Sequence, residues 1–331
     1  MKILITGGAG FIGGHLAQKL LDQDGIHIDL LDNFSRAVHD PFLEQLTAND
    51  NVGIVERDLL EHGSLDDLAD DYTHIVHFAA IVGVSHVLKK PYDVLRRNEA
   101  MTFAALDLAH RQKDLKRFVF ASTSEIVAGT LLAYGIDVPT PETTPICMPD
   151  PSDIRHTYLL SKLYGEALCH HCGMPFTAVR PHNVYGPRMG LVHVVPEIAK
   201  KVLALPQGGD LEVFSADHKR AFCYIDDATE IISRLMLGGD DCQGVFNLGT
   251  QDPEVTIREV CQTICDVLDR SDVNLVEGPT TTGSPTRRAP DMSKTTSACG
   301  YSSQVSLKEG IGKTLAWYDE HVFAGKGPSA V

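Results

Sequence analysis

The chain begins with Lys2-Ile3-Leu4-Ile5-Thr6, followed at once by Gly7-Gly8-Ala9-Gly10-Phe11-Ile12-Gly13 and by a helix-like stretch over residues 14–21. A short apolar strand, a glycine-rich turn and an amphipathic helix, in this order, let backbone N–H groups at the helix N-terminus approach a pyrophosphate. Glycines at Gly7, Gly10 and Gly13 permit the tight turn and the close approach. The stretch therefore predicts a dinucleotide-binding site.

The end of the second apolar run indicates which dinucleotide binds. Asp32 directly follows residues 26–31, at about the separation from the glycines expected of an acid that binds the adenosine ribose through its 2′-OH. A carboxylate there would repel a 2′-phosphate, so NAD is favoured over NADP. Two alternatives stay open: Asp32 as a solvated turn residue before Asn33, and Arg36 as a cation for a 2′-phosphate. For Arg36 we expect a place against the adenine or in solvent.

Composition limits the class of protein. The 331 residues, 43% of them hydrophobic, can bury the core of one large domain or of two interleaved ones. No segment has the apolar length of a membrane span, and the N-terminus lacks a signal-peptide pattern, so we expect no membrane contact and a cytoplasmic location. The eight cysteines are irregularly spaced and read as reduced thiols. Cys169-His170-His171-Cys172 lies in a predicted helix, where its side chains would not converge, so no metal site is predicted.

The net charge of −15 argues against a nucleic-acid surface. An anionic ligand would therefore have to meet local cations. For each candidate, the alternative is a solvated surface charge. The candidates are Arg180, Arg188, Lys219, Arg220, Arg287 and Arg288.

Strands alternate with helices through the first half of the chain, which predicts an α/β fold: a Rossmann-type, doubly wound parallel sheet with ligands beyond the carboxyl ends of its strands. After about Pro181 the loops lengthen, which predicts a smaller C-terminal α/β substrate lobe. We expect an NAD-binding domain over 1–180, joined by segments near 221–250, and a lobe that binds the substrate over 181–331. Strands are predicted at 2–6, 26–31, 52–55, 74–78, 117–121, 176–180 and 245–248, and helices at 14–21, 64–69, 92–110, 155–172, 195–203, 226–236, 257–268 and 307–319.

The candidate chemistry lies in the middle of the chain. Tyr158 and Lys162 are four residues apart on a predicted helix, which puts both on one face. A lysine ammonium there can lower the pKa of the phenol, so that the phenol takes a hydroxyl proton near neutral pH. Ser122-Thr123-Ser124-Glu125 directly follows a predicted strand end, where a nicotinamide would lie. The alternative for Tyr158 and Lys162 is a pair of amphipathic surface residues.

Together these motifs resemble the extended short-chain dehydrogenase/reductase family, specifically its nucleotide-sugar epimerase, dehydratase and decarboxylase members. The resemblance covers nearly the whole chain, and the order of the motifs makes it specific. Its stretches are Thr6 to Gly13, Asp32-Asn33, Arg57-Asp58-Leu59, His77-Phe78-Ala79-Ala80, Ser122 to Glu125, Tyr158 to Lys162, Arg180 to Arg188, Arg220 to Asp227 and Arg288-Ala289-Pro290-Asp291.

The resemblance implies a role for each matching residue. Tyr158 resembles the base that removes the sugar 4-OH proton, Lys162 its activator and the anchor of the nicotinamide ribose, and Thr123 the hydroxyl that binds the same oxygen. For the cofactor, the resemblance and the glycine turn together indicate Gly7, Gly10, Phe11, Ile12, Gly13, Asp32, Asn33, Asp58, Leu59, Ala79 and Ala80, besides Tyr158 and Lys162. For a nucleotide-diphosphate sugar it implies Asn183, Arg220 and Arg288, with Arg188 at the same lobe interface.

The implied reaction is redox-neutral: hydride leaves C4 of a hexose for NAD⁺, a 4-keto intermediate follows, and the hydride returns. Epimerisation and dehydration are the main expectation, UDP-glucuronate decarboxylation is an alternative, and Glu125 is the residue on which the choice turns. A structural carboxylate that accepts backbone N–H bonds is the alternative for Glu125. After Glu125 the chain departs from the family's Val-Tyr-Gly and reads Ile126-Val127-Ala128-Gly129, with a long proline-rich loop over 130–153, so substrate selection should be unusual.

Two other classes of function remain open from the residues. A net reductase would exchange NAD(H) at each turnover, and a non-catalytic dinucleotide-binding protein would be expected to lack the tyrosine or the lysine. By analogy with relatives, we expect a homodimer formed through the predicted helices 92–110 and 155–172. The apolar residues on these helices are equally well explained as intramolecular core; they are Phe103, Leu106, Leu160 and Leu163.

Overall fold

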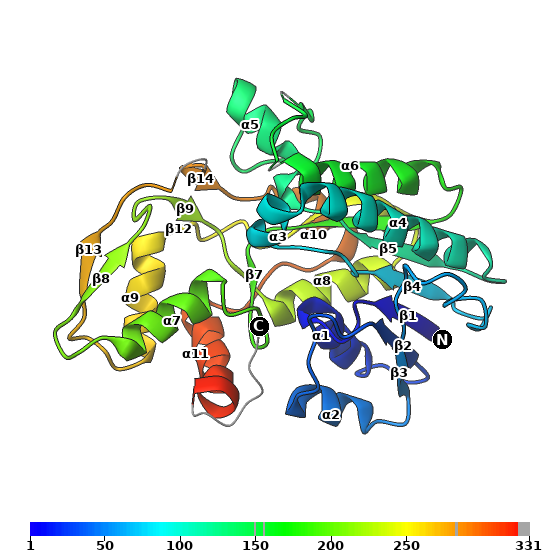
Figure 1. Cartoon of the computed structure of the whole chain (residues 1–331), viewed down its shortest axis with the longest axis horizontal. Helices are drawn as coiled ribbons and strands as arrows, with labels where there is room; N and C mark the ends of the chain where they lie inside the picture. Colours follow the sequence, from blue (N-terminus) through cyan, green and yellow to red (C-terminus); the bar gives the residue numbers. More distant parts are fainter. Residues whose placement is uncertain (149, 155, 282–283, 324–331) are drawn as a thin grey trace.

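The computed structural model describes residues 1–148, 150–154, 156–281 and 284–323. Its centre is a seven-stranded parallel sheet in the order β11-β6-β5-β4-β1-β2-β3 (Figure 1). The strands after β1 are added on one side of it as far as β3, and β4 then begins the other side, so the strand order reverses between β1 and β4. In open parallel sheets, ligands bind at such a point. The strands are β1 Lys2–Thr6, β2 His27–Asp32, β3 Val52–Glu56, β4 His74–His77, β5 Arg117–Ala121, β6 Phe176–Pro181 and β11 Gly244–Leu248.

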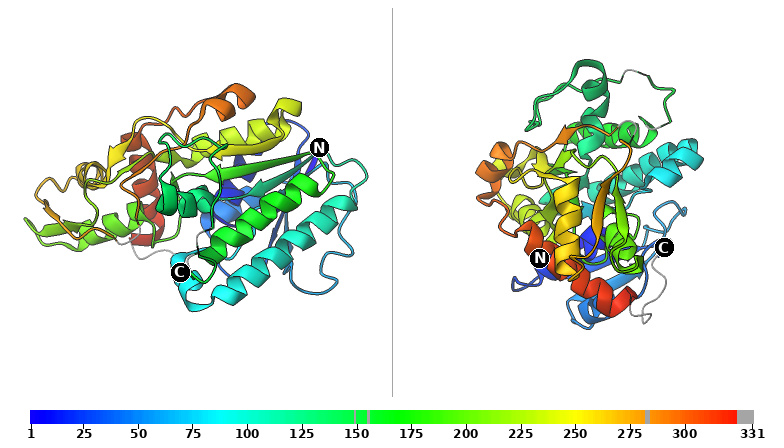
Figure 2. Two further views of the ribbon diagram at one scale, coloured as in Figure 1. Left: turned by 90° about the horizontal axis from the view of Figure 1, so that it is seen from above. Right: turned by 90° about the vertical axis from the view of Figure 1, so that its left-hand side faces the viewer.

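Helices cover both faces of this sheet, so its central strands are buried almost completely, as a parallel sheet requires. On one face α1 Phe11–Leu20 packs against α8 Ile225–Leu237. On the other face α4 Pro91–His110 and α6 His156–His171 run side by side (Figure 2). The predicted doubly wound α/β fold is confirmed.

A second apolar core lies beside the sheet and is formed mainly by three helices, α7 Val194–Ala204, α9 Ile257–Val267 and α11 Leu307–Tyr318. Small sheets join it, of which β12-β9-β14 carries the candidate arginines. Their strands are β7 Val184–Tyr185, β8 Asp210–Val213, β9 Lys219–Arg220, β10 Cys223–Tyr224, β12 Val255–Thr256, β13 Asn274–Glu277 and β14 Arg287–Arg288. The predicted division of the chain near residue 180 stays a prediction, although α8 and β11 do lie with the large sheet.

The structure differs from the prediction in two segments. Residues 64–69 form successive turns rather than a helix, because Asp66 and Leu68 donate their N–H groups to residues three positions back. The segment 130–153, expected as a loop, contains most of the helix α5 Ala128–Tyr134, which follows the short helix η1 Ser124–Val127. The predicted helix 155–172 is α6, and Arg155 lies outside the described residues.

The remaining elements are short and were not predicted. Among the described residues, no helix combines the length and apolar character needed to cross a bilayer. The short elements are α2 Pro41–Thr47, α3 Val84–Lys89, α10 Ser293–Cys299, η2 Asp240–Cys242 and η3 Asp319–Phe323.

Candidate active site

The glycine turn between β1 and α1 has no room for side chains. Gly7 has a φ of +68°, and a Cβ there would lie 2.8 Å from the backbone nitrogen of Ala79. A Cβ on Gly13 would lie 2.4 Å from the carbonyl oxygen of Gly7. Gly10 caps α1 without a side chain, which leaves the first-turn N–H groups, including those of Phe11 and Ile12, available to an anion. This cradle fits the pyrophosphate of NAD.

The residues expected at the adenosine end lie together at the carboxyl ends of β2 and β3. Asp32 accepts hydrogen bonds from the N–H groups of Ala9, at 3.2 Å, and Phe34, at 3.0 Å. Burial raises the pKa of Asp32, and these backbone bonds oppose the shift. Asn33 donates to Asp58 at 3.1 Å, and Leu59 beside it is buried. Asp32 therefore holds the glycine turn as well as facing the expected ribose position.

The loop after β4 is fixed against the same turn. The N–H of Ala79 donates to the hydroxyl of Thr6 at 3.3 Å, and Ala79 and Ala80 are both half-buried. Asn98, which sequence reasoning missed, exchanges hydrogen bonds with the backbone of Ile81, at 2.7 and 3.1 Å, and donates to Ser161 at 3.3 Å. In the sequence, Asn98 is one polar residue among several in an amphipathic helix, so nothing there indicated this role. Asn98 ties the loop to the helix that carries Tyr158 and Lys162.

Tyr158 and Lys162 lie on one face of α6, as predicted. The ammonium of Lys162 donates to the carbonyl of Ala121 at 2.7 Å and lies 5.8 Å from the centre of the Tyr158 ring. Burial lowers the pKa of Lys162 to about 8. Burial also raises the pKa of Tyr158, and the Glu125 carboxylate adds to this. The expected lowering of the phenol pKa is therefore wrong for the chain alone, because burial dominates.

Thr123 and Glu125 follow the end of β5. Thr123 is buried, caps η1 and accepts a hydrogen bond from the N–H of Glu125 at 3.2 Å. The Glu125 side chain is exposed, and no hydrogen bond or ion pair holds its carboxylate among the described residues. Its charge nevertheless raises the pKa of Tyr158 and opposes the lowering of the pKa of Arg288. The alternative of a structural carboxylate bonded to backbone N–H groups is therefore not supported.

Arg220 and Arg288 are neighbours at the same register position of β9 and β14. Arg288 donates to the side chain of Asn183 at 2.8 Å, and Asn183 donates to the carbonyl of Ala221 at 2.9 Å. Burial, with a smaller contribution from Arg288, lowers the pKa of Arg220 to about 10. The buried Nε of Arg288 has no partner in the described part of the chain.

Arg220 is buried and donates to the carbonyls of Lys219 and Pro285, both at 2.7 Å, and to the hydroxyl of Ser284 at 2.9 Å, whereas Arg288 is half-buried. Two adjacent cations, one with an unpartnered buried donor, suit an anion such as a diphosphate.

The other candidate cations have partners within the protein. Arg180 forms a buried two-point ion pair with Glu166, at 2.9 and 2.8 Å. Arg287 pairs with Glu254, and Lys219 is exposed.

Arg188, which was expected at the substrate, has a different place. It pairs with Asp40 at 2.7 Å and donates to the carbonyls of Ala9 and Gly10 at 3.0 and 3.4 Å. The Nη1 and Nη2 of Arg188 therefore hold the glycine turn while its Nε holds Asp40, so these contacts favour a supporting role at the cofactor cradle over the expected contact with the substrate.

The cysteine and histidine cluster on α6 is part of the packing. Cys172 donates its thiol to the carbonyl of Cys169 at 3.1 Å, and the ring of His170 packs against Phe176. No group of three metal-binding side chains comes together within the described ranges. All eight cysteines are free thiols, which confirms that they are unpaired.

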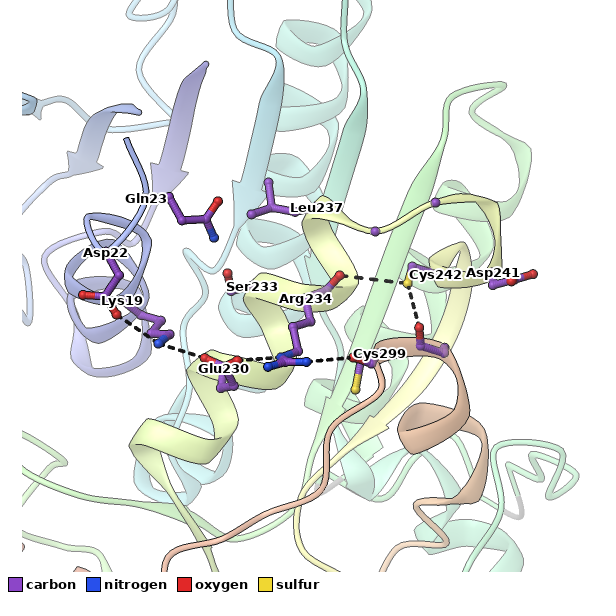
Figure 3. A pocket seen from close by; sticks show the side chains of 13 residues that line it. Lys19, Asp22, Gln23, Glu230, Ser233, Arg234, Leu237, Asp241, Cys242 and Cys299 are labelled. Atoms are coloured by element: carbon purple, nitrogen blue, oxygen red, sulfur yellow. Dashed lines mark hydrogen bonds and ion pairs between the residues drawn. The ribbon is translucent and has the colours of Figure 1, made fainter. Parts of the chain in front are cut away.

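A separate hollow of about 570 Å³ lies near the C-terminal ends of α1 and α8, away from the glycine turn (Figure 3). Its cations already have carboxylate partners, because Lys19 and Arg234 both pair with Glu230, at 2.8 and 2.5 Å. None of the candidate site residues lines it. The chemistry is therefore assigned to the carboxyl edge of the sheet.

Comparison with known proteins agrees with this site. The model of the NAD dependent epimerase/dehydratase family matches residues 3–249. The chain is 32% identical to the UDP-N-acetyl-alpha-D-glucosaminuronate decarboxylase of Bacillus cytotoxicus, over 96% of this chain and 98% of the relative. It is 29% identical to UDP-glucuronic acid decarboxylase 6 of Arabidopsis thaliana, over 94% and 87%. The structure of the UDP-glucuronic acid 4-epimerase from Bacillus cereus, in complex with UDP-glucuronic acid and NAD, has a TM-score of 0.81 and 25% identity, covering 97% of this chain and 99% of that one.

The family match covers most of the chain, so the chain belongs to the NAD dependent epimerase/dehydratase family. This confirms the resemblance seen in the sequence and identifies NAD as the cofactor. The roles of individual site residues remain predictions.

Proposed function

We propose that this family member is a decarboxylase of a UDP-hexuronate, which acts through transient oxidation at C4. Two of its relatives carry the names of UDP-hexuronate decarboxylases, which favours this branch over the epimerases and dehydratases expected from the sequence. The observation that carries the proposal is the exposed, unbonded carboxylate of Glu125, close enough to both Tyr158 and Arg288 to shift their pKa values. In the proposed reaction it would serve the proton that moves next to C4.

The chemistry follows from the position of the ketone. Bound NAD⁺ supplies a hydride acceptor for C4 and later returns the same hydride. A 4-ketone makes the C5 carboxylate a β-keto acid, so the C5–C6 bond can break with release of CO₂. The electron pair of that bond is left as an enolate, which takes a proton at C5. The cofactor ends in its starting state, and the net change is the loss of CO₂ and the gain of a proton.

The chain's own residues would move the protons. Tyr158, with the ammonium of Lys162 nearby, would take the 4-OH proton and return it when the ketone is reduced. The hydroxyl of Thr123 would hold the same oxygen. Glu125 would supply the proton at C5, directly or through water. Arg220 and Arg288 would hold the diphosphate, because they are adjacent and the buried Nε of Arg288 lacks a partner among the described residues.

A second candidate is a UDP-hexuronate 4-epimerase. It is supported by the similarity to the UDP-glucuronic acid 4-epimerase, which shares the fold at a TM-score of 0.81. An epimerase would return the hydride to the opposite face of C4 and retain the carboxylate. The net reductase remains a third reading, which would consume reduced cofactor in proportion to product.

The test is to incubate the purified protein, without added cofactor, with UDP-glucuronate, UDP-N-acetylglucosaminuronate and UDP-glucose. Mass spectrometry should show loss of CO₂ from a uronate and no reaction with UDP-glucose. An isobaric product from a uronate would replace the proposal with the epimerase. Product formed only with added reduced cofactor would replace it with the reductase.

Two substitutions assign the steps. Tyr158→Phe should abolish both CO₂ release and formation of reduced cofactor, whereas Tyr164→Phe, on the exposed side of the same helix, should leave both unchanged. Glu125→Gln should keep the formation of reduced cofactor but slow the appearance of the final product about 100-fold, the size typical of general acid–base catalysis. Full activity of Glu125→Gln would remove Glu125 from the mechanism.

We also propose a homodimer through α4 and α6. Phe103 and Tyr164 lie edge to face across these helices at 6.0 Å, and they are 43% and 42% exposed. Leu106 is buried within the protomer instead. Analytical ultracentrifugation should show a dimer that Phe103→Glu converts to a monomer. Leu203→Glu, at an equally exposed apolar residue on α7, should leave the mass unchanged; identical masses for both variants would refute this interface.

A further inference from the structure

The connection from β2 to α2, residues 33–40, lies on one side of the glycine turn. The loop after β4, which contains Val82, lies on the other side, because β1 stands between β2 and β4 in the sheet. A dinucleotide whose pyrophosphate sits on the turn must pass between these two segments. A bond that joins them on the solvent side would therefore lie across the bound cofactor.

Arg36 makes such a bond. Its Nη1 donates to the carbonyl oxygen of Val82 at 3.2 Å, across a gap of 46 residues in the chain. The same connection is held at its other end by the buried pair of Asp40 and Arg188, and Arg188 also donates to the carbonyls of Ala9 and Gly10. The connection is thus fixed to the turn at one end and reaches across it at the other.

The charge of Arg36 is uncompensated by the protein. No carboxylate lies within ion-pair distance of its guanidinium in the described part of the chain. The imidazole of His193, from the loop that precedes α7, is close enough for Arg36 to contribute to lowering its pKa, after burial as the larger cause. Arg36 therefore lies near three segments: its own connection, the loop after β4 and the start of the C-terminal lobe.

We propose that Arg36 is a clasp over the cofactor groove, which closes the groove above the glycine turn and slows the release of NAD. Arg36 forms no ion pair in the described part of the chain, so its charge would be available to an anionic pyrophosphate held on the turn. The bond to Val82 must open before the dinucleotide can leave. This role differs from the sequence-based alternatives for Arg36, which were a 2′-phosphate contact, a place against the adenine and a place in solvent.

Retention of NAD has a chemical consequence for this family. A redox-neutral reaction needs the same hydride returned to the same sugar, so a cofactor that left in its reduced form would strand a 4-keto intermediate. The clasp rests on NAD binding and does not depend on which sugar reacts. The test of the clasp can therefore fail while the proposed decarboxylation holds. In the same way, the proposed decarboxylation can fail while the clasp holds.

The experiment measures the exchange of bound NAD in the full-length protein. The protein is loaded with a fluorescent etheno-NAD, excess NAD is added, and the decay of the bound signal gives the dissociation rate. Arg36→Ala should release the probe about three- to tenfold faster, since one charge-assisted hydrogen bond at an exposed site is lost. The dissociation rate of Arg36→Gln, which keeps a hydrogen-bond donor but loses the charge, should lie between those of the unmodified protein and of Arg36→Ala.

Arg111→Ala is the matched control. Arg111 also donates one hydrogen bond to a loop carbonyl, that of Leu65 at 2.7 Å, besides an ion-pair contact with Asp66 at 3.9 Å. It directly follows α4 and precedes β5, so it lies at the edge of the parallel sheet opposite the glycine turn. Its exchange rate should equal that of the unmodified protein. Equal rates for Arg36→Ala and Arg111→Ala would overturn the clasp, and so would a selective loss of affinity for NADP relative to NAD in Arg36→Ala, which would assign Arg36 to a 2′-phosphate instead. Thermal melting of each variant checks that the fold is intact.

Discussion

The two halves of the cleft differ in how completely the protein satisfies its own polar groups. At the cofactor half, the polar side chains around the glycine turn have partners within the protein: Asp32 accepts from the backbone N–H groups of Ala9 and Phe34, and Arg188 pairs with Asp40. At the substrate half, the buried Nε of Arg288 and Nδ1 of His182 have no partner among the described residues, and the carboxylate of Glu125 is free. The cofactor cradle is thus formed in advance, and the substrate half leaves polar groups for a ligand.

His182 shows how the substrate half is built. Asn247 donates both amide hydrogens, to the carbonyls of Thr140 and Asp291 at 2.9 and 3.0 Å, so its oxygen must accept. His182 therefore carries its hydrogen on Nε2, which lies 3.2 Å from that oxygen, and Nδ1 is left as an acceptor. Burial, aided by the charge of Arg288, lowers the pKa of His182 to about 3 and keeps it neutral. The imidazole thus stays neutral beside the charge of Arg288.

The largest expected effect tests whether the cofactor half is preformed. Gly13→Ala would place a methyl group 2.4 Å from the carbonyl of Gly7, where only backbone surrounds it. We expect NAD to be absent from the purified variant and activity to be lost. Gly312→Ala, in α11 with open space around the new methyl group, should keep NAD and gain up to about 1 kcal/mol of stability. The measurement is the amount of NAD that each purified variant releases when it is denatured. A normal amount from Gly13→Ala would show that the turn adapts to the extra methyl group.

Arg188 and Arg288 test this comparison further, because the sequence analysis expected both of them at the substrate. Arg188→Ala would leave the buried carboxylate of Asp40 unpaired, which should cost about 3–5 kcal/mol in the free energy of unfolding and reduce NAD content. Arg288→Ala should keep NAD content normal and lower kcat/KM about ten- to hundredfold through a raised KM. Urea unfolding, NAD content and kinetics of both variants separate the roles. A raised KM with normal stability for Arg188→Ala would restore its place at the substrate.

The contrast also marks what the sequence could predict. The sheet, the main helices and the pairing of Tyr158 with Lys162 depend on local periodicity and on the glycine turn, which are visible in one stretch of chain. The role of Arg188 was not visible, because its partner Asp40 is 148 residues away and either half of the cleft would accept an arginine. The η1 and α5 helices were missed because prolines and the departure after Glu125 indicated a loop. The pKa of Tyr158 was misjudged because burial, which is a tertiary property, raises it, and the nearby Glu125 carboxylate adds to the shift.

The last prediction concerns Lys162, the residue at which both halves meet. Burial holds its pKa near 8 in the folded chain, below the ordinary value of 10.5 that it regains on unfolding. Between these values the unfolded chain binds more protons, so the lysine's contribution to the free energy of unfolding rises with pH from about 8 to 10.5, by roughly 3 kcal/mol in total. Below pH 8 the folded protein bears the full cost of a buried ammonium.

Urea unfolding of the protein and of Lys162→Met at pH 7.5 and pH 10 measures this contribution, because other groups that titrate in the same range cancel in the difference between the two proteins. Lys162→Met should be the more stable of the two at pH 7.5, with the gap closing towards pH 10. A gap independent of pH would mean that Lys162 keeps an ordinary pKa. In that case the contact with the carbonyl of Ala121 compensates its burial, and the ammonium remains fully charged beside Tyr158 through the whole catalytic range.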